Sequence, residues 1–90
     1  MIKPVRLQRR RTRGFKLVSP NGLPNIYVGR PTKWGNKFGK TALENYRRWL
    51  ERSIDVGELN IEELRGKNPV CWCRPGALCH ADILLEIANR

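Results

Sequence analysis

Three cysteines and the single histidine of this chain lie close together near its C-terminal end, at Cys71, Cys73, Cys79 and His80. The run Val70-Cys71-Trp72-Cys73 predicts a strand, in which Cys71 and Cys73 project from the same face because they are two residues apart. Three thiols and one imidazole form a ligand set that zinc takes in structural sites. We therefore identify Cys71, Cys73, Cys79 and His80 as candidate zinc ligands.

The same residues are compatible with two other roles. Their C-x-C spacing and adjacent Cys-His pair depart from the usual C-x-x-C and H-x-x-x-H motifs of zinc sites. If Cys79 lies in the first turn of a helix, free backbone N–H groups stabilise its thiolate. Cys79, His80 and the nearby Asp82 are then candidate catalytic residues of a small enzyme acting on a nucleotide or nucleic acid. Alternatively, the cysteines pack as small apolar residues and His80 caps the helix.

The positive charge of the chain is concentrated at its N-terminus. Eighteen Lys and Arg residues against eight Asp and Glu give a formal net charge of +10. The first sixteen positions hold no acidic residue and seven basic ones, namely Lys3, Arg6, Arg9, Arg10, Arg11, Arg13 and Lys16. Such a patch attracts polyanions. Because no aromatic stripe accompanies it, nucleic acid or a phosphorylated nucleotide is the expected partner, and not a membrane. A solvated arm and an acidic surface on a host protein are the alternatives.

A glycine-rich loop at residues 29–40 carries further basic and aromatic residues. Trp34 among several lysines fits a surface that stacks on a base and neutralises phosphates. The alternative is that Trp34 and Phe38 fill the core. Gly39-Lys40-Thr41 looks like the end of a P-loop, but the spacing from Gly35 is too short, which excludes NTPase activity. The candidate phosphate-binding residues are Arg9, Arg10, Arg11, Arg13, Arg30, Lys33, Trp34, Asn36 and Lys37.

The elements that position these residues must fit into 90 residues, of which 40% are hydrophobic. Apolar and β-branched runs predict short strands at 5–8, 15–18, 26–28 and 70–73. A helix is expected from a Thr41–Glu44 capping box to Ile54, a shorter one at 60–66 and a terminal one to 89. We expect one α/β or α+β domain spanning 1–90, with a small mixed sheet of about four strands and two main helices. It comprises a basic arm at 1–16, the loop at 29–40 and a Cys/His strand–turn–helix at 69–90.

The chain length, the apolar runs and the number of cysteines exclude several classes of protein. A chain of 90 residues is too short for a TIM barrel or a complete dinucleotide-binding fold. No apolar run approaches the roughly 18–20 residues that span a bilayer. An odd number of cysteines argues against a disulfide framework, and no secretory leader is evident. We therefore expect a cytoplasmic protein.

Two segments together resemble a known family. They are Gly29-Arg30-Pro31-Thr32-Lys33-Trp34-Gly35-Asn36-Lys37-Phe38 and Cys71-Trp72-Cys73-Arg74-Pro75 with Cys79-His80-Ala81-Asp82. These are similar to the G-R-P-S/T-K-W-G-N-P-F and C-W-C…P…C-H-x-D motifs of domain-of-unknown-function family 4326, which occurs in phages and bacteria. Lys37 departs from the proline usual in that family.

The resemblance covers nearly the whole chain and implies a small phage or bacterial accessory protein, but no particular reaction. It also implies that the loop and the cysteine segment form one site. The residues carried over on this basis are Trp34, Asn36, Cys71, Cys73, Cys79, His80 and Asp82.

Overall fold

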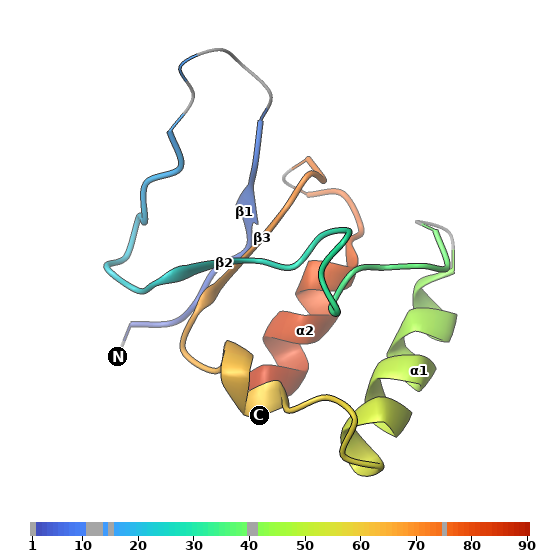
Figure 1. Cartoon of the computed structure of the whole chain (residues 1–90). Helices are drawn as coiled ribbons and strands as arrows, with labels where there is room; N and C mark the ends of the chain where they lie inside the picture. Colours follow the sequence, from blue (N-terminus) through green and yellow to red (C-terminus); the bar gives the residue numbers. More distant parts are fainter. Residues whose placement is uncertain (1, 11–13, 15, 40–41, 75) are drawn as a thin grey trace.

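The computed structural model describes residues 2–10, 14, 16–39, 42–74 and 76–90. Its strands are β1 (Leu7–Gln8), β2 (Asn25–Tyr27) and β3 (Asn68–Cys71), and its helices are α1 (Leu43–Asp55), the 3-10 helix η1 (Ile61–Leu64) and α2 (His80–Ala88). Helix α2 packs on β3 and η1, and α1 packs against α2 (Figure 1). The mixed α/β class predicted from the sequence is confirmed. No helix in these described ranges has both the length and the apolar character needed to cross a bilayer.

The sheet is parallel, with β3 between β1 and β2. Leu7 and Tyr27 both lie opposite Val70, one on each side of the central strand. Three parallel strands in the described residues replace the mixed sheet of about four strands that the sequence predicts. Residues 16–18 alternate in polarity but form no strand, because the chain there returns from the end of β1 to the start of β2 (Figure 1). Parallel neighbours require such a return connection.

The central strand is shifted by two residues from its predicted position at 70–73. It begins at Asn68, whose backbone N–H donates to the Pro24 carbonyl at 2.8 Å. It ends at Cys71, whose carbonyl accepts a hydrogen bond from the Arg9 N–H at 2.7 Å. Trp72 and Cys73 therefore lie beyond the strand, at the beginning of a turn. The turn, and not the regular pleat of a strand, sets the direction of Cys73.

Helix α1 covers the core through the apolar stripe predicted for it. Tyr46 and Leu50 on this stripe are completely buried. The helix begins after Ala42, which makes no side-chain capping bond, while Thr41 of the predicted capping box lies outside the described residues. The 3-10 helix η1 is capped by Asn60, whose side-chain oxygen accepts from the Glu62 N–H at 3.1 Å. The short helix predicted at 60–66 is thus one 3-10 turn.

The buried side-chain amide of Asn68, in β3, links the central strand to the segments that lead into β1 and β2. The Asn68 side chain is fully buried, and its oxygen accepts from the Val5 N–H at 3.0 Å and from Asn21 Nδ2 at 3.0 Å. Its Nδ2 donates to Asn21 Oδ1 at 2.9 Å and to Asn25 Oδ1 at 3.0 Å. A buried polar group is costly unless its bonds are made. Asn68 is therefore the polar centre around which the N-terminal ends of the strands assemble.

We predict that Asn68→Ala lowers the free energy of unfolding by about 1–3 kcal/mol, because it leaves the Val5 N–H and the Asn21 amide without their buried partner. Urea unfolding followed by far-UV circular dichroism measures the change. Asn45→Ala, on the exposed side of α1, is the matched control and should stay within about 0.5 kcal/mol of the parent. Equal effects of the two substitutions would contradict the role given to Asn68.

Candidate metal centre

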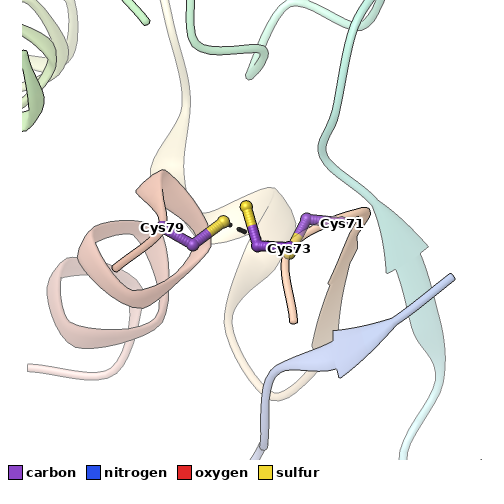
Figure 2. A group of neighbouring side chains, drawn as sticks. All are labelled: Cys71, Cys73 and Cys79. Carbon is purple, nitrogen blue, oxygen red and sulfur yellow. Dashed lines mark hydrogen bonds between the residues drawn. The ribbon is translucent and has the colours of Figure 1, made fainter. Parts of the chain in front are cut away.

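The three cysteines converge from three consecutive pieces of the fold. Cys71 ends β3, Cys73 follows in the turn, and Cys79 is the residue immediately before α2. Figure 2 shows their side chains meeting between the end of the strand and the start of the helix. All three Sγ atoms lie within 4.8 Å of one another, and those of Cys71 and Cys79 are 3.2 Å apart. Two sulfurs at about 2.3 Å from one tetrahedral ion are about 3.8 Å apart, a separation that lies between the 3.2 Å of this pair and the 4.8 Å limit of the group.

The contact between Cys71 and Cys79 shifts their acidities in opposite directions. The Cys79 thiol donates to Cys71, and this bond lowers the pKa of Cys71 despite its burial. The same bond, together with burial, raises the pKa of Cys79 to about 11. A catalytic cysteine needs a lowered pKa to be a thiolate at neutral pH. In the metal-free protein the environment of Cys79 therefore favours the protonated thiol over a nucleophile.

His80 is buried beside the cluster and is bonded on both ring nitrogens. Its Nε2 lies 2.8 Å from the Val28 carbonyl oxygen, and its Nδ1 lies 3.6 Å from Cys79 Sγ. The carbonyl can only accept, so the partners assign the ring proton to Nε2 and leave Nδ1 facing the sulfur. Burial lowers the pKa of His80, but the bonds to Cys79 and Val28 outweigh it and the net pKa is raised.

Of the four predicted ligands, the structure brings the three cysteines together and leaves His80 at the margin. The group of candidate ligand atoms within 4.8 Å of one another contains Cys71, Cys73 and Cys79, and His80 is not in it. Cys79 has extended backbone angles before the helix, and the His80 ring is held through Nε2 by the Val28 carbonyl. The described residues thus supply three converging sulfurs.

Arg6 holds the turn that carries the cysteines. Its side chain is only 11% exposed, and its Nη1 donates to the Ala77 carbonyl at 2.7 Å and to Asp82 Oδ2 at 2.8 Å. Its Nη2 donates to the Arg74 carbonyl at 2.9 Å. Asp82, a candidate catalytic residue on the sequence, is ion-paired with Arg6. Sequence reasoning counted Arg6 among the arm charges, and no pattern in the sequence distinguishes it from its basic neighbours.

A cavity of about 370 Å³ lies between the cysteine cluster and the glycine-rich loop. Cys71, Cys73 and Cys79 contribute one part of its wall, and Gly29, Arg30 and Asn36 contribute another. The two sequence motifs therefore border the same space, although Asn36 and Cys71 are 35 positions apart in the sequence. The loop thus lines one side of the cavity that the cysteines line on another.

The loop residues predicted to bind phosphate are engaged within the protein. Trp34 is 3% exposed and lies in the hydrophobic core, where its carbonyl accepts from the Tyr46 hydroxyl at 2.6 Å. A ring buried this deeply has no open face for a base, so the core role replaces the predicted stacking role. Lys33 is ion-paired with Glu63 at 2.8 Å.

The remaining loop residues shape the backbone. Arg30 donates from Nε and Nη2 to the Asn36 carbonyl at 2.9 and 2.7 Å. Asn36 itself donates to the Gly39 carbonyl and accepts from the Phe38 N–H, both at 2.9 Å. Lys37 lies over the Trp49 ring, 4.6 Å from its centroid. These contacts fold the loop on itself.

Arg9 and Arg10 of the basic arm directly follow β1. The Arg9 guanidinium lies 5.3 Å from the Tyr27 ring centroid and 5.4 Å from that of Trp72. Arg9 and Arg10 border a second hollow beside Tyr27. Arg11 and Arg13, also predicted to bind phosphate, lie outside the described residues.

Fold and site together define a small α/β protein whose three clustered cysteines could hold a metal ion. The chain belongs to the family described as Domain of unknown function (DUF4326), whose model matches residues 7–90. This match confirms the family resemblance inferred from the loop and cysteine segments. No curated protein and no solved structure matched the chain.

We predict that Arg6→Lys lowers the free energy of unfolding by about 1–3 kcal/mol, since one ammonium group cannot replace the planar fork that reaches Ala77, Arg74 and Asp82. Amide hydrogen exchange at residues 76–82 should also become faster. Arg10→Lys, nearby and exposed, is the matched control and should change neither quantity. If both variants unfold and exchange alike, Arg6 does not hold the turn.

Proposed function

We propose that this protein binds one zinc ion through Cys71, Cys73 and Cys79. The convergence of the three Sγ atoms within 4.8 Å carries the proposal. Thiolate ligands favour zinc over hard cations such as magnesium and calcium. A chain this short buries a smaller share of its surface than a larger domain, and a bound metal adds folding free energy. The ion would fix the end of β3 to the start of α2.

The arrangement of the sulfurs favours a metal over simple core packing. Cys71 and Cys79 are buried, but Cys73 is only partly buried and still directs its sulfur to the other two. Apolar packing gives no reason for three sulfurs to meet, whereas a metal ion does. His80 then has a positioning role, because its ring is fixed by the Val28 carbonyl and its Nδ1 faces Cys79 Sγ.

The catalytic alternative has less support. The pKa of Cys79 is raised to about 11, which opposes nucleophilic attack at neutral pH. The Asp82 carboxylate is ion-paired with Arg6, and this pairing leaves it less suited to assist catalysis at Cys79 and His80.

We predict that the purified protein contains one zinc per chain and that all three cysteines resist alkylation until a chelator removes the ion. Mass-resolved alkylation with and without chelator, alongside metal analysis, measures both properties. Cys73→Ala should lose the metal and expose Cys71 and Cys79 together, while His80→Gln should retain it. Selective alkylation of Cys79 in metal-free protein, independent of chelator, would contradict the zinc site and favour the reactive thiol.

We further propose that the basic N-terminal segment, residues 1–16, binds nucleic acid. Neither Arg9 nor Arg10 forms an ion pair among the residues that the structure describes, whereas Lys33 and Arg47 do. Arg9 also lies over two aromatic rings, an arrangement suited to contact with bases as well as phosphates. Arg11 and Arg13 belong to the same basic run of the sequence and lie outside the described residues. The loop residues Lys33, Trp34 and Lys37 take no part in it.

We predict that affinity for DNA or RNA falls log-linearly with salt, and that replacing Arg9, Arg10 and Arg11 with Ala lowers the slope by up to about 3. Fluorescence anisotropy with a labelled oligonucleotide at several salt concentrations measures the slope. Arg47→Ala/Arg48→Ala on α1 is the control for loss of charge and should leave the slope nearly unchanged. Binding that is insensitive to salt, or equally affected by the control, would exclude this surface. Capture of an acidic host protein without any nucleic-acid affinity would indicate the protein-binding alternative.

A further inference from the structure

The cysteine cluster faces the cavity described above. Cys71, Cys73, Cys79 and His80 all contribute to its lining, and its volume of about 370 Å³ falls within the usual range for small-molecule sites. A structural zinc site normally has four protein ligands and is closed, whereas a site with three protein ligands keeps one position for water or substrate. The number of converging ligands therefore determines what kind of metal site this is.

Among the described residues, three ligand atoms converge and all are sulfurs. His80 Nδ1 contacts Cys79 Sγ at 3.6 Å but lies outside the group, and its ring is held in place through Nε2 by the Val28 carbonyl. This geometry makes His80 a hydrogen-bonding neighbour of a ligand sulfur and not a fourth ligand. One coordination position is then left on the side of the cavity.

Two aromatic side chains form a fixed wall of the cavity. Trp72 Nε1 donates to the Tyr27 hydroxyl at 2.9 Å, and that hydroxyl donates to the Arg30 carbonyl at 2.7 Å. Gly29 is required here, because a Cβ at this position would collide with the Tyr27 hydroxyl. Leu43 and Leu78 add apolar surface, and Leu78 is 77% exposed although it is a large apolar side chain. Flat aromatic and aliphatic walls suit a planar ligand.

We propose that this cavity binds a small planar heteroaromatic molecule and that a ring nitrogen of this ligand takes the open coordination position of the metal. The inference rests on the zinc site proposed above. The walls supply apolar contact and stacking, and the three thiolates with the metal supply the specificity for a lone-pair donor. No covalent bond is made or broken in the ligand, which is bound by coordination and by contact with the walls.

Cobalt-substituted protein tests the proposal directly, because Co²⁺ reports its ligands through its visible absorption. Benzimidazole and indole are the probes, since they have nearly the same size and shape but only benzimidazole has a ring nitrogen with a free lone pair. We expect benzimidazole to shift the d–d bands saturably and indole to leave them unchanged. The His80→Gln protein should keep its thiolate-to-cobalt charge-transfer bands, because the three sulfurs hold the ion without the imidazole.

The aromatic wall is tested by Trp72→Ala, which should weaken benzimidazole binding roughly tenfold. Phe38→Ala is the matched control, because Phe38 has similar exposure (37% against 39% for Trp72) and does not line the cavity. Thiolate-to-cobalt charge-transfer bands verify that each variant keeps its metal site. Leu78→Ser, at an exposed position, provides a second wall variant should Trp72→Ala lose that site, and it should weaken binding severalfold.

The outcomes separate the two proposals. Failure to bind Co²⁺ or Zn²⁺ would overturn the metal site and this inference with it. A cobalt site with thiolate charge-transfer bands but no response to benzimidazole would overturn the inference alone. So would loss of the cobalt site in His80→Gln, because the imidazole would then be a ligand that holds the ion.

Discussion

The hydrogen-bonded central strand β3 is the constraint on which the rest of the structure depends. Its four residues are all buried, and it has a parallel neighbour on each side. Its first residue, Asn68, holds the approaches to β1 and β2 through side-chain hydrogen bonds. Its last residue, Cys71, is part of the sulfur cluster. Because such short strands provide few ladder bonds, the side-chain bonds of Asn68 to Val5 and Asn25 help to define the register.

The positive charges of the N-terminal segment have two different tasks. Arg6, just before β1, is largely buried and donates to two backbone carbonyls in the turn between Cys73 and Cys79. It also pairs with Asp82 in the first turn of α2. Arg9, just after β1, lies over two aromatic rings and makes no ion pair among the described residues. Arginine suits the first task because its planar fork can reach several acceptors at once. A net-charge argument treats the two alike, which is why it identifies a basic surface but misses the residue that holds the cysteine turn.

Sequence patterns predicted the elements whose signal is local. The apolar stripe of α1 and the start of α2 after Cys79 follow from helical periodicity, and both are observed. Whether the sheet is parallel could not be read from alternation, because residues 16–18 have a strand-like pattern but belong to a return connection. The cysteines were recognised as a cluster because they are close in sequence. His80 lies at the edge of the cluster because its ring is bonded to Val28, a residue 52 positions away. Motif spacing cannot predict a bond between residues so far apart in the sequence.

Val28 explains how two distant motifs come to border one cavity. Its N–H donates to the Val70 carbonyl at 2.9 Å and so continues the pairing of β2 with β3, next to Cys71. Its carbonyl accepts from His80, next to Cys79. Gly29 follows directly and begins the loop, so the start of the loop is fixed by bonds to both ends of the cysteine segment. The Tyr27 hydroxyl then joins Trp72 to the Arg30 carbonyl across the same space. Substitutions in the loop can therefore alter the cysteine cluster without contacting it, through the positions of Val28 and His80.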